Sequence, residues 1–198
     1  MSALTILIIR HAEKPGEDWP GPGLTDKGEA DTESLVIRGW QRAGAWTALF
    51  GAGLGGADYP APQAIYAATP RAPDKLNQGP SRRPYETIAA LALRLNGGEP
   101  NKSIAKGQED DLVKVLLKLQ GVVLVCWEHK AIISDIFPKL PVSNRGDLPT
   151  HWSGTRFDVV LRFDRAAGAT DFVFRELFPC LMSGDSNKPL KGDPKDGV

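Results

Sequence analysis

The chain has 198 residues, and its 24 lysines and arginines balance 24 aspartates and glutamates, so the formal net charge is zero. This balance argues against non-specific binding to nucleic acid or to an anionic membrane. Hydrophobic residues make up 41% and charged residues 24%, which is ordinary for a globular domain and excludes a fully disordered chain. No apolar run approaches the roughly 20 residues that a membrane-spanning helix needs. Two cysteines, Cys126 and Cys180, are too few for a disulfide framework or a four-thiolate zinc site, and we expect one domain in a reducing cytoplasm.

The first part of the chain alternates apolar runs with loops. Residues 4–9 (LTILII) are apolar throughout, which is typical of a central strand buried on both faces. Residues 11–33 are rich in glycine, proline and acids and predict a long loop. Apolar spacing predicts a helix over 35–50 with its apolar stripe towards the sheet. The glycine-rich run over 51–62 follows this helix instead of a strand, so we interpret it as a connector and not as a nucleotide-binding loop.

The remaining chain predicts further strands and helices before a polar tail. We expect strands over 64–68 and 121–127, helices over 83–95, 109–119 and 129–137, a loop over 70–80, and a hairpin of 157–163 with 171–178. Residues 183–198 contain almost nothing apolar. They predict a mobile tail after a domain of residues 1–182.

Two of the three histidines stand directly after the two most strand-like runs. Arg10 and His11 follow the first run, and His129 follows the second. Ligands of open α/β sheets bind outside the carboxyl ends of the strands, so two such histidines can face one crevice. Arg82 and Arg83 open a predicted helix, where the helix dipole already favours an anion. Together these residues predict a cationic, anion-binding site.

This pattern resembles the histidine phosphatase, or phosphoglycerate-mutase-like, superfamily. Arg10-His11-Ala12-Glu13 is similar to its Arg-His-Gly-Glu signature, with alanine in place of the usual glycine. Arg83 with Thr87 four residues later resembles its second arginine segment, and His129 after an apolar strand resembles its second histidine. The likeness covers roughly residues 4 to 163 and includes, besides these motifs, Ser81, Leu35, Gly39, Arg42 and Ala43.

The resemblance implies a catalytic domain over residues 1–182, built as a three-layer α/β/α sandwich around a central mixed, mostly parallel sheet. It implies hydrolysis of a phosphomonoester through a phosphohistidine on His11, without metal or other cofactor. Arg10 and Arg83 would stabilise the charge of the transferred phosphoryl group. His129 would donate to a phosphate oxygen, preferably as a cation. The expected partner is a small phosphorylated substrate or phosphate, and not a nucleic acid or a membrane.

The sequence leaves the proton donor and the exact function open. Four carboxylates are candidates for protonating the leaving group, because no motif selects among them: Glu13, Glu99, Glu109 and Glu128. A mutase-type phosphotransferase and a non-catalytic phospholigand-binding module of the same fold are the alternative functions. Glu128 and Lys130 stand where serine and glycine are more usual in the superfamily, which affects the expected size and polarity of the pocket. We expect Arg82 in solvent or at the substrate rim, His151 near the pocket mouth, and Cys126 as an inert core thiol.

Overall fold

A five-stranded sheet forms the centre of the computed structural model, which describes residues 1–16, 18–53, 55–70 and 81–190. The described strands have the order β2-β3-β1-β4-β5. They are β1 (Leu4–Arg10), β2 (Ala64–Ala67), β3 (Gly121–Trp127), β4 (Val160–Arg165) and β5 (Val173–Leu177). β1 and β2 pair with β3 in parallel, whereas β4 is antiparallel to both of its neighbours. The expected mixed, mostly parallel sheet is therefore confirmed.

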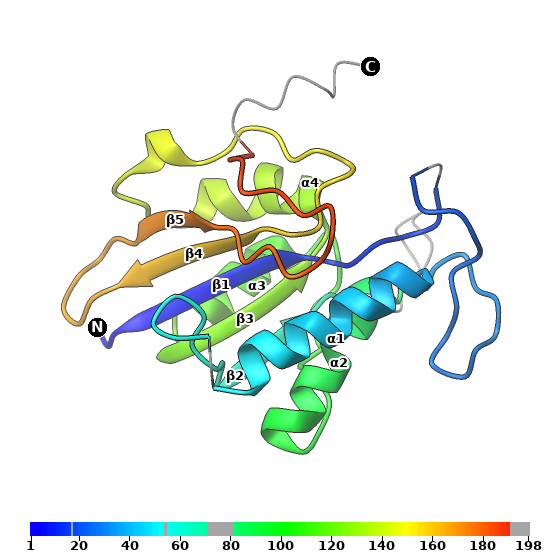
Figure 1. The fold of residues 1–198 in the computed structure, drawn as a ribbon. Helices are drawn as coiled ribbons and strands as arrows, with labels where there is room; N and C mark the ends of the chain where they lie inside the picture. The colour runs from blue at the N-terminus through cyan, green and yellow to red at the C-terminus, as the bar shows by residue number, and fades with distance from the viewer. Residues whose placement is uncertain (17, 54, 71–80, 191–198) are drawn as a thin grey trace.

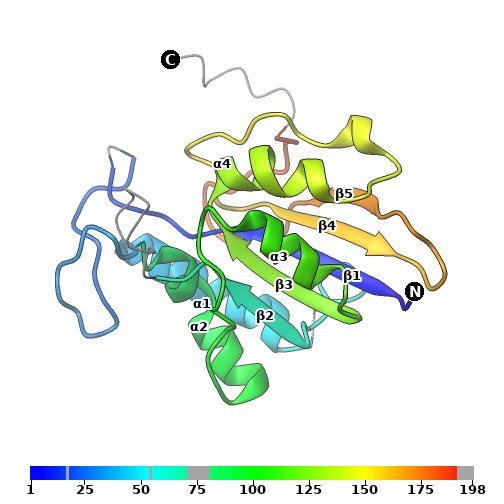
Figure 2. The ribbon, with the colours of Figure 1, turned by 180° about the vertical axis from the view of Figure 1, so that it is seen from behind.

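Helices cover both faces of this sheet, as the two opposite views show (Figure 1, Figure 2). α1 and α2 pack together on one face, and α3 and α4 lie on the other. The helical segments are α1 (Ile37–Gly51), α2 (Arg83–Asn96), α3 (Glu109–Leu116), α4 (His129–Ala131) with its continuation as a π-helical turn (Ile132–Ile136) and a 3₁₀ turn (Phe137–Lys139), and a further 3₁₀ turn (Arg145–Asp147). This arrangement confirms the expected three-layer α/β/α sandwich.

The alternation of side chains along β1 divides the core into two parts. Leu4, Ile6 and Ile8 pack in the cluster that includes α3, whereas Leu7 and Ile9 pack with α1 and α2. Successive strand side chains point to opposite faces, so a wholly apolar strand needs cover on both sides. All five side chains are buried. The central position predicted for residues 4–9 is thus confirmed.

The helix predicted over 109–119 is shorter in the structure and ends at Leu116. The Lys118 N–H bonds to the Val115 carbonyl, and the Leu119 N–H bonds to the Leu116 carbonyl. This three-residue spacing is that of a 3₁₀ turn, which tightens the end of the helix before β3 begins.

Other elements end close to the residues that the sequence predicts. α2 ends at Asn96 and is capped by Gly97, whose φ of 67° is in the left-handed region that favours glycine. The predicted terminal hairpin forms between β4 and β5, although residues 157–159 remain in the preceding loop. Residues 71–80 of the predicted loop lie outside the described residues.

The first part of the predicted tail packs against the domain. Asp185 pairs with Arg42 at 2.8 Å, and the Ser186 N–H donates to Asp158 at 2.6 Å. Leu190 is only 2% exposed. After β5 the segment crosses the front of the sheet towards α1 (Figure 1). Mobility of residues 183–198 stays a prediction, and residues 191–198 lie outside the described part of the chain.

No helix within the described ranges combines the length and apolar character that crossing a membrane requires.

Candidate active site

The ends of β1 and β3 bring the two strand-end histidines to one edge of the sheet. In the parallel register, Arg10 lies opposite Trp127, and the His11 N–H donates to the Trp127 carbonyl at 3.0 Å. Two residues after Trp127, His129 begins α4. Because both strands stop at the same level, the side chains that follow them share the crevice beyond the sheet.

Arg10 is buried, with 1% of its surface exposed. Its Nη1 donates to the carbonyl oxygens of Ser153 and Arg156, at 2.8 and 3.0 Å. Its guanidinium carbon lies 3.9 Å from the centroid of the Phe157 ring. A buried charge needs such hydrogen bonds and cation–π contact to offset the loss of water. The loop over residues 153–157 therefore fixes the direction of the Arg10 side chain.

His11 is held by the backbone of the next residue. Its Nδ1 lies 2.8 Å from the Ala12 carbonyl oxygen, a contact that requires the proton to be on Nδ1. The lone pair of the neutral ring is then on Nε2. Burial lowers the pKa of His11 well below its ordinary value of 6.5, and the positive charges of Arg10 and Arg83 lower it further. The imidazole is thus neutral, and Nε2 is nucleophilic at neutral pH.

Thr87 ties the loop after β1 to the first turn of α2. Its Oγ1 accepts from the Ala12 N–H at 2.9 Å and donates to the Arg83 carbonyl at 2.7 Å. This pair of bonds explains why Arg83 and Thr87 are four residues apart, since a helical hydroxyl reaches the carbonyl one turn back. The loop that carries His11 and the helix that carries Arg83 are consequently fixed to each other.

The two adjacent arginines at the start of α2 differ in their surroundings. The Arg83 side chain is 15% exposed and its Nη2 lies 3.5 Å from Glu33, while the same nitrogen donates to the Thr32 carbonyl at 2.6 Å. The Arg82 side chain is 55% exposed and lies 3.5 Å from Asp31. Of these two arginines, only Arg83 is among the causes of the low His11 pKa. Arg83 is thus near enough to lower the pKa of His11, although its side chain bonds to the Thr32 carbonyl, and Arg82 lies largely in solvent.

We expect Arg83→Ala to lower kcat/KM for a phosphomonoester by about 100-fold or more, because it removes a positive charge from the candidate phosphate site. Arg82→Ala is the matched control and should change kcat/KM by less than about threefold, since exposed ion pairs contribute little. Arg83→Lys should restore activity only in part, because an ammonium lacks the planar fork of a guanidinium. Steady-state kinetics of the three variants measure this, and a larger loss for Arg82→Ala would reverse the assignment.

His129 is 9% exposed and interacts with the preceding glutamate. Its Nδ1 lies 2.9 Å from Glu128 Oε1, without the alignment of a hydrogen bond. Burial lowers the pKa of His129; the Glu128 carboxylate opposes this effect, and the positive charge of Arg10 adds to it. The net shift is downward, so in the ligand-free site His129 is neutral near pH 7, and its expected donation to a phosphate oxygen as a cation stays a prediction.

Glu128 caps α4 and is held as a carboxylate. Its oxygens accept from the Lys130 and Ala131 N–H groups, both at 3.0 Å, and Lys106 lies 3.3 Å away. Burial alone would raise the pKa of Glu128, but its contacts with His129 and these two N–H groups lower it. A carboxyl group that remains ionised is a poor proton donor at neutral pH.

Glu13 is fully buried behind the His11 loop. Arg42 Nε donates to its Oε1 at 2.9 Å, and Arg38 lies 3.5 Å from the same oxygen. A Cβ added at Gly39 would come within 2.5 Å of the Glu13 carbonyl oxygen. The glycine therefore allows α1 to approach the loop after β1 closely. Glu13 of this loop then bonds to Arg42 of α1.

The other two proton-donor candidates also have structural partners. Glu109 is buried and accepts from Trp127 Nε1 at 2.9 Å. Glu99 bonds to Tyr85 at 2.8 Å and to Lys102 at 2.5 Å, and Lys102 and Tyr85 lower its pKa. Each of the four candidate carboxylates is thus engaged elsewhere, and none is among the described residues that line the cavity beside His129.

A cavity of about 470 Å³ lies next to His129. Its described lining residues are His129, Lys130, Ile133, Ser134, Thr150, His151, Trp152 and Gly154. Trp152 and Gly154 flank Ser153, whose carbonyl holds Arg10, so the cavity adjoins the residues around the candidate phosphate site. This position suits the organic part of a small ligand. His151 lies in this lining, as expected.

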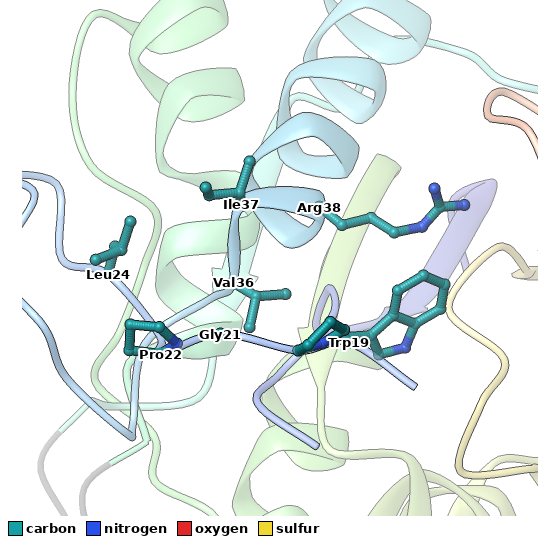
Figure 3. Close-up of a pocket in the computed structure, with 8 residues that line it drawn as sticks. Trp19, Gly21, Pro22, Leu24, Val36, Ile37 and Arg38 are labelled. Carbon is teal, nitrogen blue, oxygen red and sulfur yellow. The ribbon is translucent and has the colours of Figure 1, made fainter. Parts of the chain in front are cut away.

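A smaller cavity, of about 160 Å³, lies between the loop over 19–24 and the start of α1 (Figure 3). The guanidinium of Arg38 lies over the indole of Trp19, 4.6 Å from the ring centroid. The remaining walls are apolar or glycine, including Leu24 and Val36. Arg38 therefore links the loop over 19–24, through Trp19, to Glu13, which lies two residues after His11.

Backbone oxygens complete the site in a way that no residue pattern indicated. The carbonyls of Ser153 and Arg156 hold Arg10, and every residue type has a carbonyl.

Burial raises the pKa of the Cys126 thiol, which agrees with an inert core thiol. Among residues 1–16, 18–53, 55–70 and 81–190, no group of three or more His, Cys, Asp or Glu side chains is placed to hold a metal ion.

Solved structures of similar fold include two mycobacterial proteins. Mycobacterial glucosyl-3-phosphoglycerate phosphatase is 14% identical with a TM-score of 0.45, over 89% of this chain and 98% of that chain. Mycobacterial hydrolase 2 is 18% identical with a TM-score of 0.43, over 89% of this chain and 90% of that chain. No protein-family model matches the sequence, and a search of curated proteins finds no match.

Proposed function

We propose that the chain is a metal-independent phosphatase that hydrolyses a phosphomonoester through a phosphohistidine on His11. The observation that carries this proposal is the state of His11: the Ala12 carbonyl fixes the Nδ1 proton, and burial and arginine charges keep the ring neutral. A neutral imidazole directs the Nε2 lone pair at a bound anion. Arg10 and Arg83 supply the positive charge that attracts such an anion.

In the first step His11 Nε2 attacks phosphorus, the new N–P bond forms, and the bond to the leaving oxygen breaks with its electron pair. Negative charge spreads over the equatorial oxygens during this transfer. Arg10 is already fixed by the 153–157 loop, and Arg83 by its bond to the Thr32 carbonyl. Donors fixed before the reaction stabilise that charge without reorganising.

His129 would bind one of these oxygens through Nε2. Glu128 Oε1, 2.9 Å from Nδ1, favours a proton on the Nδ1 side of the ring. A bound phosphate dianion then favours a second proton on Nε2, because an opposite charge stabilises the cation. Substrate binding would thus convert the neutral His129 of the ligand-free site into the donor.

In the first step the leaving oxygen takes up a proton as its bond to phosphorus breaks, which gives the alcohol. The second step transfers the phosphoryl group from Nε2 to water, which loses a proton, and releases phosphate. Glu13, Glu99, Glu109 and Glu128 all have other partners. An alkoxide leaving group needs a proton in the transition state, whereas a phenolate needs less help. Aryl phosphates are therefore the first substrates to test.

The engagement of all four carboxylates also favours one alternative, a phospholigand-binding module that turns over slowly. Phosphate release from an aryl phosphate separates the two functions. We expect release that is unaffected by EDTA and inhibited competitively by vanadate or phosphate, which would occupy the anion site. Vanadate binding without turnover would favour the module, and loss of activity on chelation that a divalent cation restores would contradict the metal-independent mechanism.

The low pKa of His11 predicts an acid-tolerant activity. The attacking ring must be neutral, and burial together with Arg10 places its pKa well below 6.5. The value of kcat/KM should stay constant from about pH 7.5 down to about 6.5, because the free enzyme's nucleophile is already deprotonated there. A pH–rate profile corrected for the second ionisation of the substrate phosphate measures this. An acid limb centred at or above 6.5 would contradict it.

A further inference from the structure

Arg156 binds the segment 183–190 through its side chain. Its Nη1 and Nη2 donate to the carbonyls of Lys188 and Ser186, at 3.0 and 3.1 Å. Its Nε donates to Asp158 at 2.8 Å, and the other oxygen of Asp158 accepts from the Ser186 N–H at 2.6 Å. Arg156 and Asp158 are 8% and 3% exposed. These bonds close a buried ring between the loop before β4 and the C-terminal segment.

The backbone of the same residue faces the candidate active site. The Arg156 carbonyl accepts from Arg10 Nη1 at 3.0 Å and from Trp152 Nε1 at 3.0 Å. Trp152 lines the cavity beside His129. The Arg156 carbonyl thus bonds to Arg10 and to a residue of the cavity wall. The side chain of the same residue bonds to the segment 183–190.

A second connection leads from this segment to the residues behind His11. Arg42 binds Asp185 at 2.8 Å and Glu13 at 2.8 Å. All three side chains are at most 3% exposed. Glu13 lies two residues after His11. One buried arginine, Arg42, therefore joins the segment to the loop after β1, and another, Arg156, joins it to a carbonyl that holds Arg10.

We propose that residues 183–190 form a strap that positions the phosphate site, and that Arg156 is the positioning residue through which the strap directs Arg10. The inference rests on the proposed function. Arg156 acts through Arg10 and does not touch the phosphoryl group. If the Arg156 fork is lost, its carbonyl is released, and Arg10 no longer lies at a fixed distance from His11.

The chain offers a matched control for Arg156 in the neighbouring strand. Arg162 Nε donates to Asp164, also two residues later, at 2.7 Å. Its Nη1 donates to the backbone carbonyl of Asp58 at 2.9 Å. Arg162 pairs in register with Leu7, inside β1 and away from its carboxyl end. The two arginines therefore make the same kind of fork, but only Arg156 adjoins the site.

The test compares Arg156→Lys with Arg162→Lys in the full-length chain. Lysine keeps the charge but loses the fork in both variants, and we expect similar falls in Tm. For Arg156→Lys alone we expect kcat/KM to fall about tenfold and the inhibition constant of vanadate to rise about tenfold. The acid limb of kcat/KM should also move to higher pH, because a displaced Arg10 lowers the pKa of His11 less. Asp158→Asn, which weakens the same ring, should move these readouts in the same direction.

Equal effects of the two lysine variants on vanadate inhibition, or an unmoved acid limb in Arg156→Lys, would overturn the strap. A wild-type chain that neither hydrolyses aryl phosphates nor binds vanadate would instead refute the proposed function. In that case NMR titration of His11 in the ligand-free chain still decides the inference. A rise of its pKa in Arg156→Lys but not in Arg162→Lys supports the strap, and no rise overturns it.

Discussion

Replacing His11 with alanine is expected to lower the rate of aryl phosphate hydrolysis by on the order of 10⁴-fold or more, because His11 is the nucleophile of the proposed mechanism. The free energy of unfolding should change by less than about 1 kcal/mol, since the side-chain hydrogen bond of His11 is to the backbone of its own neighbour, Ala12. Activity and urea unfolding of the same variant measure the two effects.

Formation of the phosphohistidine can be measured separately from turnover. Brief incubation with a radioactive phosphodonor should label the wild-type chain with an acid-labile, base-stable phosphate, and His11→Ala should remain unlabelled. Lys118→Ala is a suitable control, because Lys118 is exposed and precedes β3 at the edge of the sheet opposite the site. Near-normal turnover in His11→Ala would show that the nucleophile is another group.

Replacing Arg42 with methionine should destabilise the fold by about 3–5 kcal/mol, because it removes the cation that two buried carboxylates share. Arg42, Glu13 and Asp185 are at most 3% exposed at the side chain. Lys114→Ala breaks an exposed pair with Asp111 and should cost less than about 0.5 kcal/mol. Urea unfolding measures both, and equal losses would mean that the Arg42 pair contributes no more than a surface pair.

The pH dependence of stability should follow from the same pair. Burial alone would raise the pKa of Asp185, but its bonds with Arg42 lower it. A carboxyl with a lowered pKa in the folded state stabilises the fold above its unfolded pKa, and this contribution is lost as pH falls through the folded value. Asp185→Asn should therefore lose less stability than wild type between about pH 5 and pH 2. Parallel acid limbs for the two proteins would contradict this.

Local patterns in the sequence were sufficient for the sheet and its helices. The apolar run over 4–9 had to be covered on both faces, and the structure places it at the centre of the sheet. Gly97 had to end α2 because it takes the left-handed conformation. These features depend on side-chain alternation, helix periodicity and backbone sterics, which neighbouring residues determine.

The sequence also supplied His11, His129 and Arg10, because residues that follow parallel strands gather at one edge. It supplied Arg83 because a helix start favours an anion. Their catalytic roles remain predictions. The sequence did not show which groups fix them. Arg10 bonds to carbonyls 143 and 146 residues away, and any amino acid could provide a carbonyl.

The tertiary structure alone decided the surroundings of the candidate acids and of residues 183–190. Glu13 became the partner of Arg42 because Gly39 lets α1 approach the loop after β1. A polar segment that looked suited to solvent is bound through Asp185, Ser186 and Lys188. Such long-range bonds depend on where the sheet and helices place distant residues, and a buried arginine can hold a polar segment that has almost no apolar surface of its own.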